Sequence, residues 1–287
     1  MKLRQTLIAL SLFALNGAFA QSEQGQLTSK LQALEASKDN KWLITPMRPN
    51  YIMPVTYWFD QNYAPLDAVD PDNDTELDHV EVKFQISFMA PVAEDAIFGN
   101  GDLYVAYTQV SFWQPYNSDE SAPFRETNYE PETFVLFQND WEIFGWKNTA
   151  NSIGYVHQSN GRGTEEYSRS WDRIAANFLF EKGNWVMNIK PWWRFSDDDE
   201  NPHIDHYMGY GHLQLAYKQG DHVFSTLLRN NLNIDRNKGA AEVNWTFPLM
   251  GRFRGIAHYF YGYGENLLDY NYESQRVGLG VMLSDFL

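Results

Sequence analysis

The chain has 287 residues, of which 44% are hydrophobic and 16% aromatic, and its mean hydropathy of -0.49 excludes a helical membrane bundle. A formal net charge of -15 and a pI near 4.8 argue against nucleic acid as a partner, because nucleic-acid binders need a cationic surface. The absence of cysteine excludes disulfides, thiol nucleophiles and Cys-ligated metals, so any metal must be bound by oxygen or imidazole.

The first 20 residues predict a secretory signal peptide. Lys2 and Arg4 precede an apolar run at 7–15, which is followed by the small-residue pattern Ala-Phe-Ala at 18–20. Because the run is too short to span a bilayer, we expect cleavage near Ala20; a retained buried helix is the alternative. In a bacterium with two membranes, this signal leads to the periplasm or the outer membrane.

Three leucines predict a short amphipathic helix before the first strand. Leu27, Leu31 and Leu34 recur at i, i+4 and i+7, a spacing that puts them on one face of a helix. Such a helix can pack in or against the mouth of a barrel. A frayed terminal segment is the alternative.

From residue 51 onward the chain consists of short segments in which apolar and polar residues alternate. The clearest is 80–90, where Val82, Phe84 and Ile86 alternate with polar residues, as in a half-buried strand. No linker, internal repeat or second domain is evident. Similar alternation predicts about a dozen strands, at 51–59, 80–90, 103–113, 134–141, 153–159, 172–180, 185–194, 207–217, 223–228, 240–247, 252–263 and 276–286.

The position of the aromatic residues favours one of two all-β folds. Each strand has an apolar and a polar face, which suits a soluble sandwich as well as a membrane barrel that turns its apolar face to lipid. Aromatic residues cluster near strand ends, at 57–59, 112–113, 192–193 and 259–263, as they do in the girdles of outer-membrane barrels. The ordinary preference of aromatic residues for strands is the alternative explanation.

One pair of strands carries residues suited to nucleophilic catalysis. His157 and Ser159 are i and i+2 in a strand, so their side chains emerge on the same face. A serine nucleophile needs a base, and the base needs an acceptor for its other nitrogen; Asp172, on the outward face of the next strand, is the candidate. The N–H of Gly161, in the turn that starts at Asn160, can face an oxyanion. The alternative is that these are ordinary surface residues without a catalytic role, but His and Asp are energetically costly on a lipid-facing surface.

Two other clusters contain metal-ligating residue types. An EF-hand-like register puts carboxylates at positions 1, 3, 5, 9 and 12, namely Asp70, Asp72, Asp74, Asp78 and Glu81. Thr75 stands where the sharp turn needs glycine, and residue 81 begins a strand, so we interpret this segment as a solvated acidic loop. His203 and His206 can bind a metal or simply face water.

Several blocks of this sequence resemble bacterial outer-membrane phospholipase A, from about Tyr51 to the C-terminus. They are 107–109, 121–131, 157–162, 168–171, 207–210, 262–265 and 276–283. The resemblance implies a single twelve-stranded antiparallel transmembrane β-barrel over 51–287, after the signal peptide (1–20) and an N-terminal segment (21–50). It also implies an enzyme of the outer membrane that cleaves acyl esters of phospholipids and lysophospholipids, requires calcium and is activated by forming a homodimer.

The resemblance assigns catalytic roles to residues already singled out. Ser159 matches the family's nucleophile and His157 its base, which makes the chain a phospholipase A1/A2 with a Ser-His-Asp type of triad. The third position is usually Asn in the family and is Asp172 here. A carboxylate stabilises an imidazolium better than a neutral amide does, and we expect nearby calcium to keep Asp172 ionised.

The resemblance also implies a calcium site shared between two subunits. Its ligands are the backbone carbonyls of Arg162 and Ser168 together with Ser121 of the partner subunit. The loop between residues 162 and 168 is one residue longer than in the family. Gln109 matches an interfacial glutamine, which implies an amide pair that bonds across the dimer; an exposed amide near a girdle is the alternative.

Two other functions remain open at this point. A non-catalytic barrel, either a channel or a structural protein, is favoured only by Asp172 in place of the family's Asn. A large stable channel would count against the enzyme, because ion pairs among charged lumen residues are expected to plug the barrel. These residues are Arg252, Arg254, Glu242, Lys83 and Lys190. An outer-membrane protease is disfavoured, since it would not have its nucleophile on the lipid side.

Overall fold

The computed structural model describes residues 25–36, 44–69, 72, 75–163, 167–195 and 200–284. The expected signal peptide at 1–20 lies outside these ranges, as do Asp70 and Asp74 of the acidic loop. Within the described ranges, no helix combines the length and the apolar character needed to cross a bilayer.

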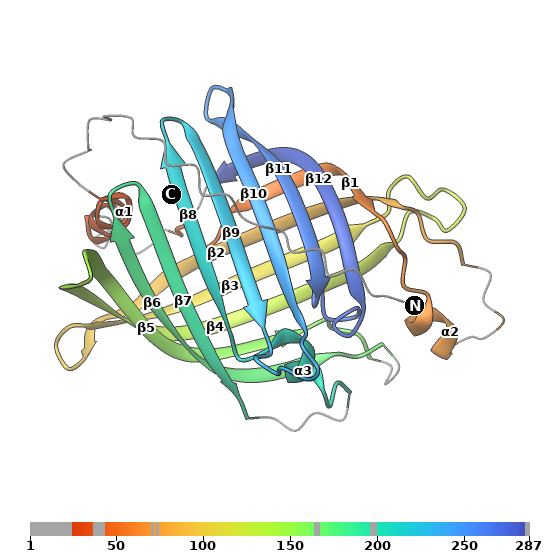
Figure 1. Ribbon diagram of the computed structural model, residues 1–287, viewed down its shortest axis with the longest axis horizontal. Helices are drawn as coiled ribbons and strands as arrows, with labels where there is room; N and C mark the ends of the chain where they lie inside the picture. The colour runs from red at the N-terminus through yellow and green to blue at the C-terminus, as the bar shows by residue number, and fades with distance from the viewer. Residues whose placement is uncertain are drawn as a thin grey trace.

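Twelve antiparallel strands form a closed barrel (Figure 1). Each strand pairs with its neighbours in the chain, and the first pairs with the last, so each of these twelve strands is paired on both sides. The predicted all-β, twelve-stranded fold is confirmed. The strands are β1 Asn50–Trp58, β2 Val80–Ile97, β3 Gly101–Trp113, β4 Phe124–Ile143, β5 Trp146–Ser159, β6 Ser170–Lys182, β7 Trp185–Arg194, β8 Gly211–Gln219, β9 His222–Asn230, β10 Gly239–Met250, β11 Phe253–Tyr263 and β12 Glu273–Ser284.

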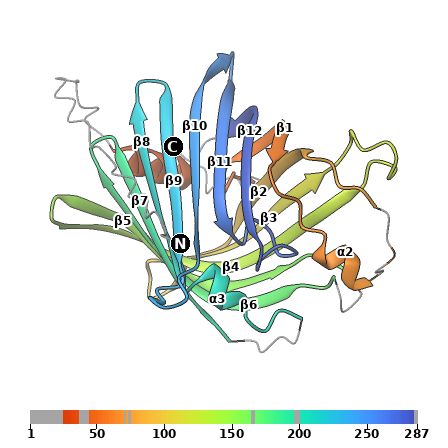
Figure 2. The same cartoon turned by 45° about the vertical axis from the view of Figure 1, so that its right-hand side comes forward.

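Strand limits differ from the predicted ones where the apolar alternation is interrupted. β4 begins at Phe124 rather than at 134, because its first half carries carboxylates, among them Glu126 and Glu130, that are buried in the lumen. The predicted strand at 207–217 begins only at Gly211, since residues 207 and 208 end a short helix, α3 (Ile204–Met208). This helix packs beside β9 and β10 (Figure 2).

The outside of the barrel is apolar and the inside is polar. In β10, Val243 and Trp245 are exposed, whereas Thr246 is buried; in β11, Tyr259 is exposed and His258 is buried. This alternation puts the apolar face of each strand outside, as in a barrel that contacts lipid. The exposed apolar set includes Ile52, Val55, Ile86, Phe88, Val105, Ile153, Ile174, Phe178, Ile189, Phe224, Leu228, Val277 and Leu279.

The two ends of the barrel differ in the length of their connections. One end has short turns, at 98–100, 144–145, 183–184, 220–221 and 251–252. The other has long loops, at 59–79 (with α2, Ala64–Val69), 114–123, 160–169, 195–210, 231–238 and 264–272. In outer-membrane barrels the short turns face the periplasm and the long loops face outward.

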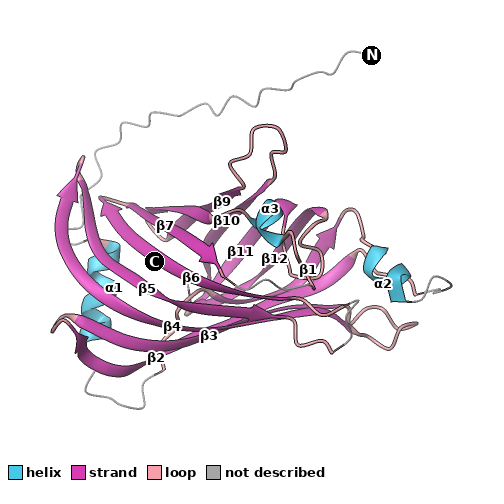
Figure 3. Ribbon diagram, turned by 90° about the horizontal axis from the view of Figure 1, so that it is seen from below, coloured by secondary structure: helices cyan, strands magenta, loops and turns pink. Residues whose placement is uncertain are grey.

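Helix α1 (Gln26–Glu35) lies inside the barrel mouth at the end with the short turns (Figure 3). The carboxylate of Glu181 in β6 accepts hydrogen bonds from the backbone N–H groups of Leu27 at 3.0 Å and Thr28 at 3.3 Å. A carboxylate at a helix N-terminus satisfies donors that have no partner within the helix and interacts favourably with the helix dipole.

The leucines of α1 face the barrel wall, as their spacing predicted. Leu27 is buried with Val186, Ala216 and Val223, which lie on β7, β8 and β9. Leu31 and Leu34 pack against a second cluster on β3, β4 and β5, formed by Tyr104, Leu136 and Ala150. The prediction of a short N-terminal helix is confirmed, and its position is in the barrel mouth.

A first cluster of ion pairs fills the lumen toward the long loops. Arg125 contacts Glu81 at 2.5 Å and Asp269 at 2.6 Å. Arg276 contacts Glu81 at 2.8 Å and Glu265 at 2.8 Å. Since all five side chains are buried, each charge depends on its partners rather than on water.

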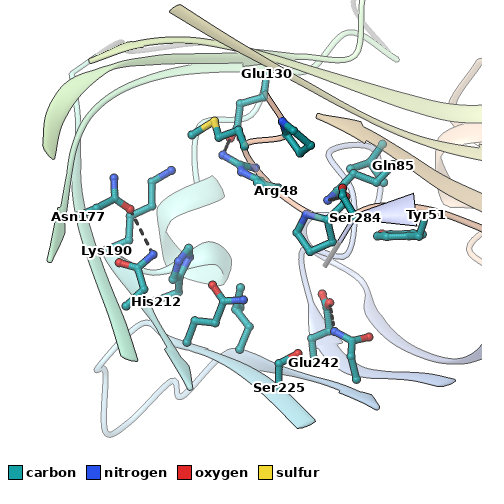
Figure 4. Close-up of a pocket in the computed structure, with 18 of the residues that line it drawn as sticks. Arg48, Tyr51, Gln85, Glu130, Asn177, Lys190, His212, Ser225, Glu242 and Ser284 are labelled. Carbon is teal, nitrogen blue, oxygen red and sulfur yellow. Dashed lines mark hydrogen bonds and ion pairs between the residues drawn. The ribbon is translucent and has the colours of Figure 1, made fainter. Parts of the chain in front are cut away.

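A second cluster lies in the middle of the lumen. Arg48 forms ion pairs with Glu130 and Glu132, while Arg173 contacts Glu130 at 2.9 Å and Lys190 contacts Glu132 at 3.3 Å. Arg48, Glu130, Arg173 and Lys190 border a cavity of about 910 Å³, which is also lined by residues of α1. Figure 4 shows Arg48 and Lys190 at this cavity.

The charged residues expected in the lumen are there with one exception. Lys83, Lys190 and Glu242 line the cavity. Arg254 is half-buried and donates to the hydroxyl of Thr246 at 3.3 Å. The expectation was wrong for Arg252, which is exposed in the turn before β11, because the strand begins one residue later than predicted.

Candidate active site

Strands β5 and β6 bring the candidate triad together at the loop end of the barrel. His157 lies directly opposite Asp172, and Ser159 lies opposite Ser170. On the same face of these two strands, Ile153, Tyr155 and Ile174 are exposed. The three candidate side chains therefore lie on the outer, lipid-facing surface, as strand parity predicted.

The His157 imidazole is hydrogen-bonded to the Asp172 carboxylate. Nδ1 lies 2.8 Å from Oδ1, and the two side chains are 35% and 26% exposed. An ionised carboxylate can only accept, so Nδ1 carries the proton and Nε2 is left as the basic nitrogen. This geometry fixes the tautomer and orientation that a general base requires.

Ser159 lies next to His157 on the same face of β5. Between these two described residues the structure contains no hydrogen bond from Oγ to Nε2. Catalytic hydrogen bonds are often long before substrate binds, and rotation of the serine side chain among its staggered rotamers moves Oγ without a change of backbone. The residues are thus adjacent but not hydrogen-bonded in this state.

Asn160 organises the loop that follows the candidate nucleophile. Its buried side-chain oxygen accepts from the backbone N–H of Arg169 at 3.0 Å and of Arg162 at 3.4 Å, while its amide donates to the carbonyl of Tyr167 at 2.7 Å. Its own N–H donates to the Arg169 carbonyl at 3.0 Å. From the sequence, Asn160 was predicted only to start a turn, although an Asn before Gly at a strand end also signals such side-chain bonds.

Gly161 occupies a position that other residues cannot adopt without strain. Its φ of +66° lies in the left-handed region, and a Cβ there would approach the ring of Tyr129 to 3.0 Å. Tyr129 lies opposite Ser159 in the β4–β5 pairing. The glycine thus keeps the backbone after the candidate nucleophile close to β4.

The three residues assigned to calcium lie in two loops at this same end. Ser121 is in the loop between β3 and β4, whereas Arg162 and Ser168 are in the loop between β5 and β6. Carbonyl and hydroxyl oxygens are ligands of the kind that calcium prefers, so the donor set fits this ion. The Ser168 carbonyl accepts a hydrogen bond from Arg169 Nη1 at 2.6 Å, which leaves its second lone pair for another partner.

The other candidate metal sites gain no support. Glu81, the last position of the EF-hand-like register, is buried and paired with Arg125 and Arg276. The rings of His203 and His206 stack on each other, with centroids 5.0 Å apart. Across the described part of the chain, no group of three or more His, Asp or Glu residues could hold a metal ion.

Gln109 is half-buried on the outward face of β3, as its position in the strand predicted. It accepts from Tyr107 Oη at 3.0 Å, and its amide donates to Ser111 Oγ at 3.0 Å. Ser111 also accepts from the hydroxyl of Thr127 at 3.2 Å. Gln109 is thus a half-buried polar residue on an outward face that is otherwise apolar, and its hydrogen-bond partner Ser111 is buried.

Comparisons with known proteins agree with the fold. A family model described as phospholipase A1 matches residues 27–283. The chain is similar to phospholipase A1 of Escherichia coli K12, with 40% identity over 247 residues, which cover 86% of this chain and 83% of that protein. Phospholipase A1 of Klebsiella pneumoniae is 39% identical over 247 residues, 86% of this chain and 84% of the relative.

Two solved structures are similar along nearly their whole length. Outer membrane phospholipase A from Escherichia coli matches with a TM-score of 0.80 and 39% identity, covering 86% of this chain and 100% of that one. The outer membrane phospholipase dimer of Salmonella typhi with bound calcium matches with a TM-score of 0.81 and 37% identity, covering 88% and 97%.

Proposed function

This chain belongs to the phospholipase A1 family, and we propose that it is a calcium-dependent serine hydrolase that cleaves acyl esters of phospholipids and lysophospholipids. It is an outer-membrane phospholipase with a β-barrel fold. The proposal includes the calcium requirement, the triad and cleavage at both acyl positions (A1 and A2). It also includes activation by dimerisation and removal of residues 1–20. The observation that carries it is the His157–Asp172 hydrogen bond of 2.8 Å beside Ser159 on the lipid-facing surface.

The triad accounts for ester cleavage as follows. His157 Nε2 removes the proton from Ser159 as Oγ attacks the ester carbonyl, and Asp172 stabilises the imidazolium that results. The N–H of Gly161 stabilises the negative charge that develops on the carbonyl oxygen. Collapse of the tetrahedral intermediate releases the lysolipid alcohol, which takes the proton from His157, and water then hydrolyses the acyl-serine by the same route.

The outward position of the triad supports a lipid substrate. A phospholipid in the outer leaflet carries its ester groups near the membrane surface, and the triad lies at the loop end of the barrel, which faces outward in such proteins. A water-soluble substrate would need no lipid-facing nucleophile. Lipid can therefore reach Ser159 by lateral diffusion along the barrel surface.

Calcium is proposed to bind the carbonyls of Arg162 and Ser168 and Ser121 of the partner subunit. When bound, it supplies positive charge that stabilises the oxyanion. Support for this comes from the loop that Asn160 closes, since its side chain holds the backbone of residues 162, 167 and 169 and thereby orients the carbonyls around it. The related Salmonella typhi structure is a dimer with bound calcium.

Dimerisation is proposed to complete the site and so to switch on activity. The outward amide of Gln109 is the candidate for a hydrogen bond across the interface, where it would exchange its bond with Ser111 for one with the second subunit. A monomer then contains the triad but lacks one calcium ligand, which makes activity depend on association.

Fatty-acid release from mixed phospholipid and detergent micelles tests the proposal. The refolded protein should release fatty acid with calcium and not with excess chelator, and Ser159→Ala should abolish release while the barrel stays folded. Substrates labelled in one acyl chain tell A1 from A2 activity. No release from folded protein under any of these conditions would overturn the enzyme and favour a channel or structural barrel.

A further inference from the structure

We propose that Tyr155 is a positioning residue that acts on the candidate triad through Asp172, an inference that rests on the proposed function. Its phenolic hydroxyl donates to Asp172 Oδ1 at 2.6 Å, and this is the same oxygen that His157 Nδ1 contacts at 2.8 Å. The carboxylate is therefore held by two donors from β5 at once. The four residues then form a Tyr-Asp-His-Ser arrangement, in which the tyrosine hydroxyl lies at the end opposite the serine.

The barrel register explains why Tyr155 reaches this carboxylate. Tyr155 lies opposite Ile174 and His157 lies opposite Asp172, so Tyr155 and Asp172 are diagonal neighbours on the same outward face. Diagonal positions are within reach of long aromatic side chains. The ring also lies against Phe195, with centroids 6.0 Å apart, and the N–H of Phe195 donates to the Asp172 carbonyl at 3.3 Å. Phe195 thus contacts both partners, Tyr155 through its ring and Asp172 through its backbone N–H.

The lipid-facing location gives the hydroxyl its importance. A carboxylate at the edge of the hydrocarbon region has little water to solvate it, so each protein donor counts more than on a soluble surface. A hydrogen bond to an ionised acceptor is short and strong, which is consistent with the 2.6 Å contact. The neutral hydroxyl stabilises the anionic form of Asp172 without cancelling its charge. It also disperses part of that negative charge, which would otherwise hold a proton on His157.

The two effects shift the pH dependence in the same direction. Without the hydroxyl, Asp172 takes up a proton more readily, and an anionic Asp172 holds the imidazolium more tightly. Both reduce the fraction of enzyme with an ionised Asp172 and a neutral His157 at low pH. Tyr155→Phe, which keeps the ring and its contact with Phe195, should therefore move the acid limb of the kcat/KM profile to higher pH by about one unit, with KM nearly unchanged.

A second tyrosine of the chain provides a matched control. Tyr261 is 46% exposed on the barrel exterior, against 39% for Tyr155, and its hydroxyl donates to the Glu273 carboxylate at 2.9 Å. It lies on β11, away from β5 and β6. Tyr261→Phe loses an equivalent hydrogen bond but should leave the pH profile where it is.

A double-mutant cycle separates positioning from packing. In an Asp172→Asn background, where no carboxylate charge remains, Tyr155→Phe should no longer move the acid limb. An equal shift in both backgrounds, or no shift in Tyr155→Phe alone, would overturn the role of Tyr155. A shift of the same size in Tyr261→Phe would also overturn it, because the effect would then not be specific to the site.

The titration of His157 provides a readout that does not need activity. Its imidazole signals can be followed by NMR in protein with labelled histidine and assigned with His157→Asn. Proton loss from His157 should occur at higher pH in Tyr155→Phe than in the parent protein, whether or not either hydrolyses lipid. An inactive parent protein would overturn the proposed function alone, whereas an unchanged His157 titration would overturn this inference alone.

Discussion

The N–H of Leu27 donates to the carboxylate of Glu181 at 3.0 Å, although the two residues are 154 positions apart in the chain. The same carboxylate accepts from the backbone and side chain of Thr28, so one buried group anchors the first turn of α1 in the barrel mouth. Because the helix has no side-chain cap of its own, Glu181 takes the place of one.

Glu181→Ala should loosen α1 without opening the barrel. Loss of an N-terminal cap costs about 1 kcal/mol, so we expect trypsin to cut at Lys30 several times faster in the variant, while the strand content stays the same. Glu142→Ala is the control, because Glu142 is an exposed carboxylate near the same end of the barrel. Equal cleavage rates in the two variants would show that Glu181 does not anchor the helix.

Asp172→Asn tests whether the charge of the third triad member matters. An amide oxygen can still accept from His157 Nδ1, so the tautomer is kept and only the electrostatic stabilisation of the imidazolium is lost. We expect kcat to fall about tenfold, as loss of a charge-assisted bond predicts. Steady-state hydrolysis of a phospholipid provides the check. If both kcat and the pH profile stay unchanged, the charge is irrelevant.

Gly161→Ala should reduce activity far more than stability. The positive φ of 66° and the approach of a Cβ to Tyr129 force the loop backbone to shift, which moves the proposed oxyanion donor. We expect a loss of kcat on the order of 100-fold, comparable to the removal of one oxyanion donor. Gly163→Ala is the control in the same loop, since no described atom lies within 4 Å of a Cβ there. Similar losses in the two variants would contradict this role.

The stability of the barrel should decrease below pH 4.5 because of Glu265. Burial opposes ionisation of this loop residue, but Arg276 and Lys83 outweigh it and lower its pKa from 4.5 to about 2. A lowered pKa stabilises the fold fully above pH 4.5, and this stabilisation is lost as the pH falls toward 2, at a cost on the order of 3 kcal/mol.

Urea unfolding in detergent micelles between pH 7 and pH 3 measures this contribution. Glu265→Gln should be less stable than the parent protein at pH 7, because buried Lys83 and buried Arg276 each lose one carboxylate partner. Its stability should also fall less steeply between pH 4.5 and pH 3. Parallel curves for the two proteins would show that Glu265 does not carry the pH dependence.

The protein should not form a large, stable channel in planar bilayers. Two clusters of ion pairs obstruct the lumen, α1 occupies one mouth, and the loop at 264–272 folds in at the other, where the N–H of Leu267 donates to Asn128 at 2.9 Å. Single-channel recordings should therefore show no long-lived openings. Large openings in lipase-active protein would contradict a plugged lumen, and large openings with no lipase activity would favour a channel.

Much of the architecture follows from the alternation of apolar and polar residues, which has a period of two along the chain. Alternating residues such as Val243 and Trp245 indicate strands, and the same parity puts His157, Ser159 and Asp172 on the outer face, because side-chain direction in a strand depends only on position. Strand limits were less predictable. β4 starts earlier than its apolar pattern, since Glu126 and Glu130 pair with cations that are distant in sequence, Arg162 in the loop after β5 and Arg173 in β6.

Contacts between segments that are distant in sequence were decided only by the tertiary structure. The Tyr155–Asp172 hydrogen bond depends on the register of β5 against β6, the bonds of Asn160 on the path of a loop, and the Glu181 cap of α1 on barrel closure. Parity specifies the face on which a side chain lies but not the neighbour that it meets. For this protein, the sequence by itself determined the strands and their faces, and the closed barrel decided which charged and polar groups pair.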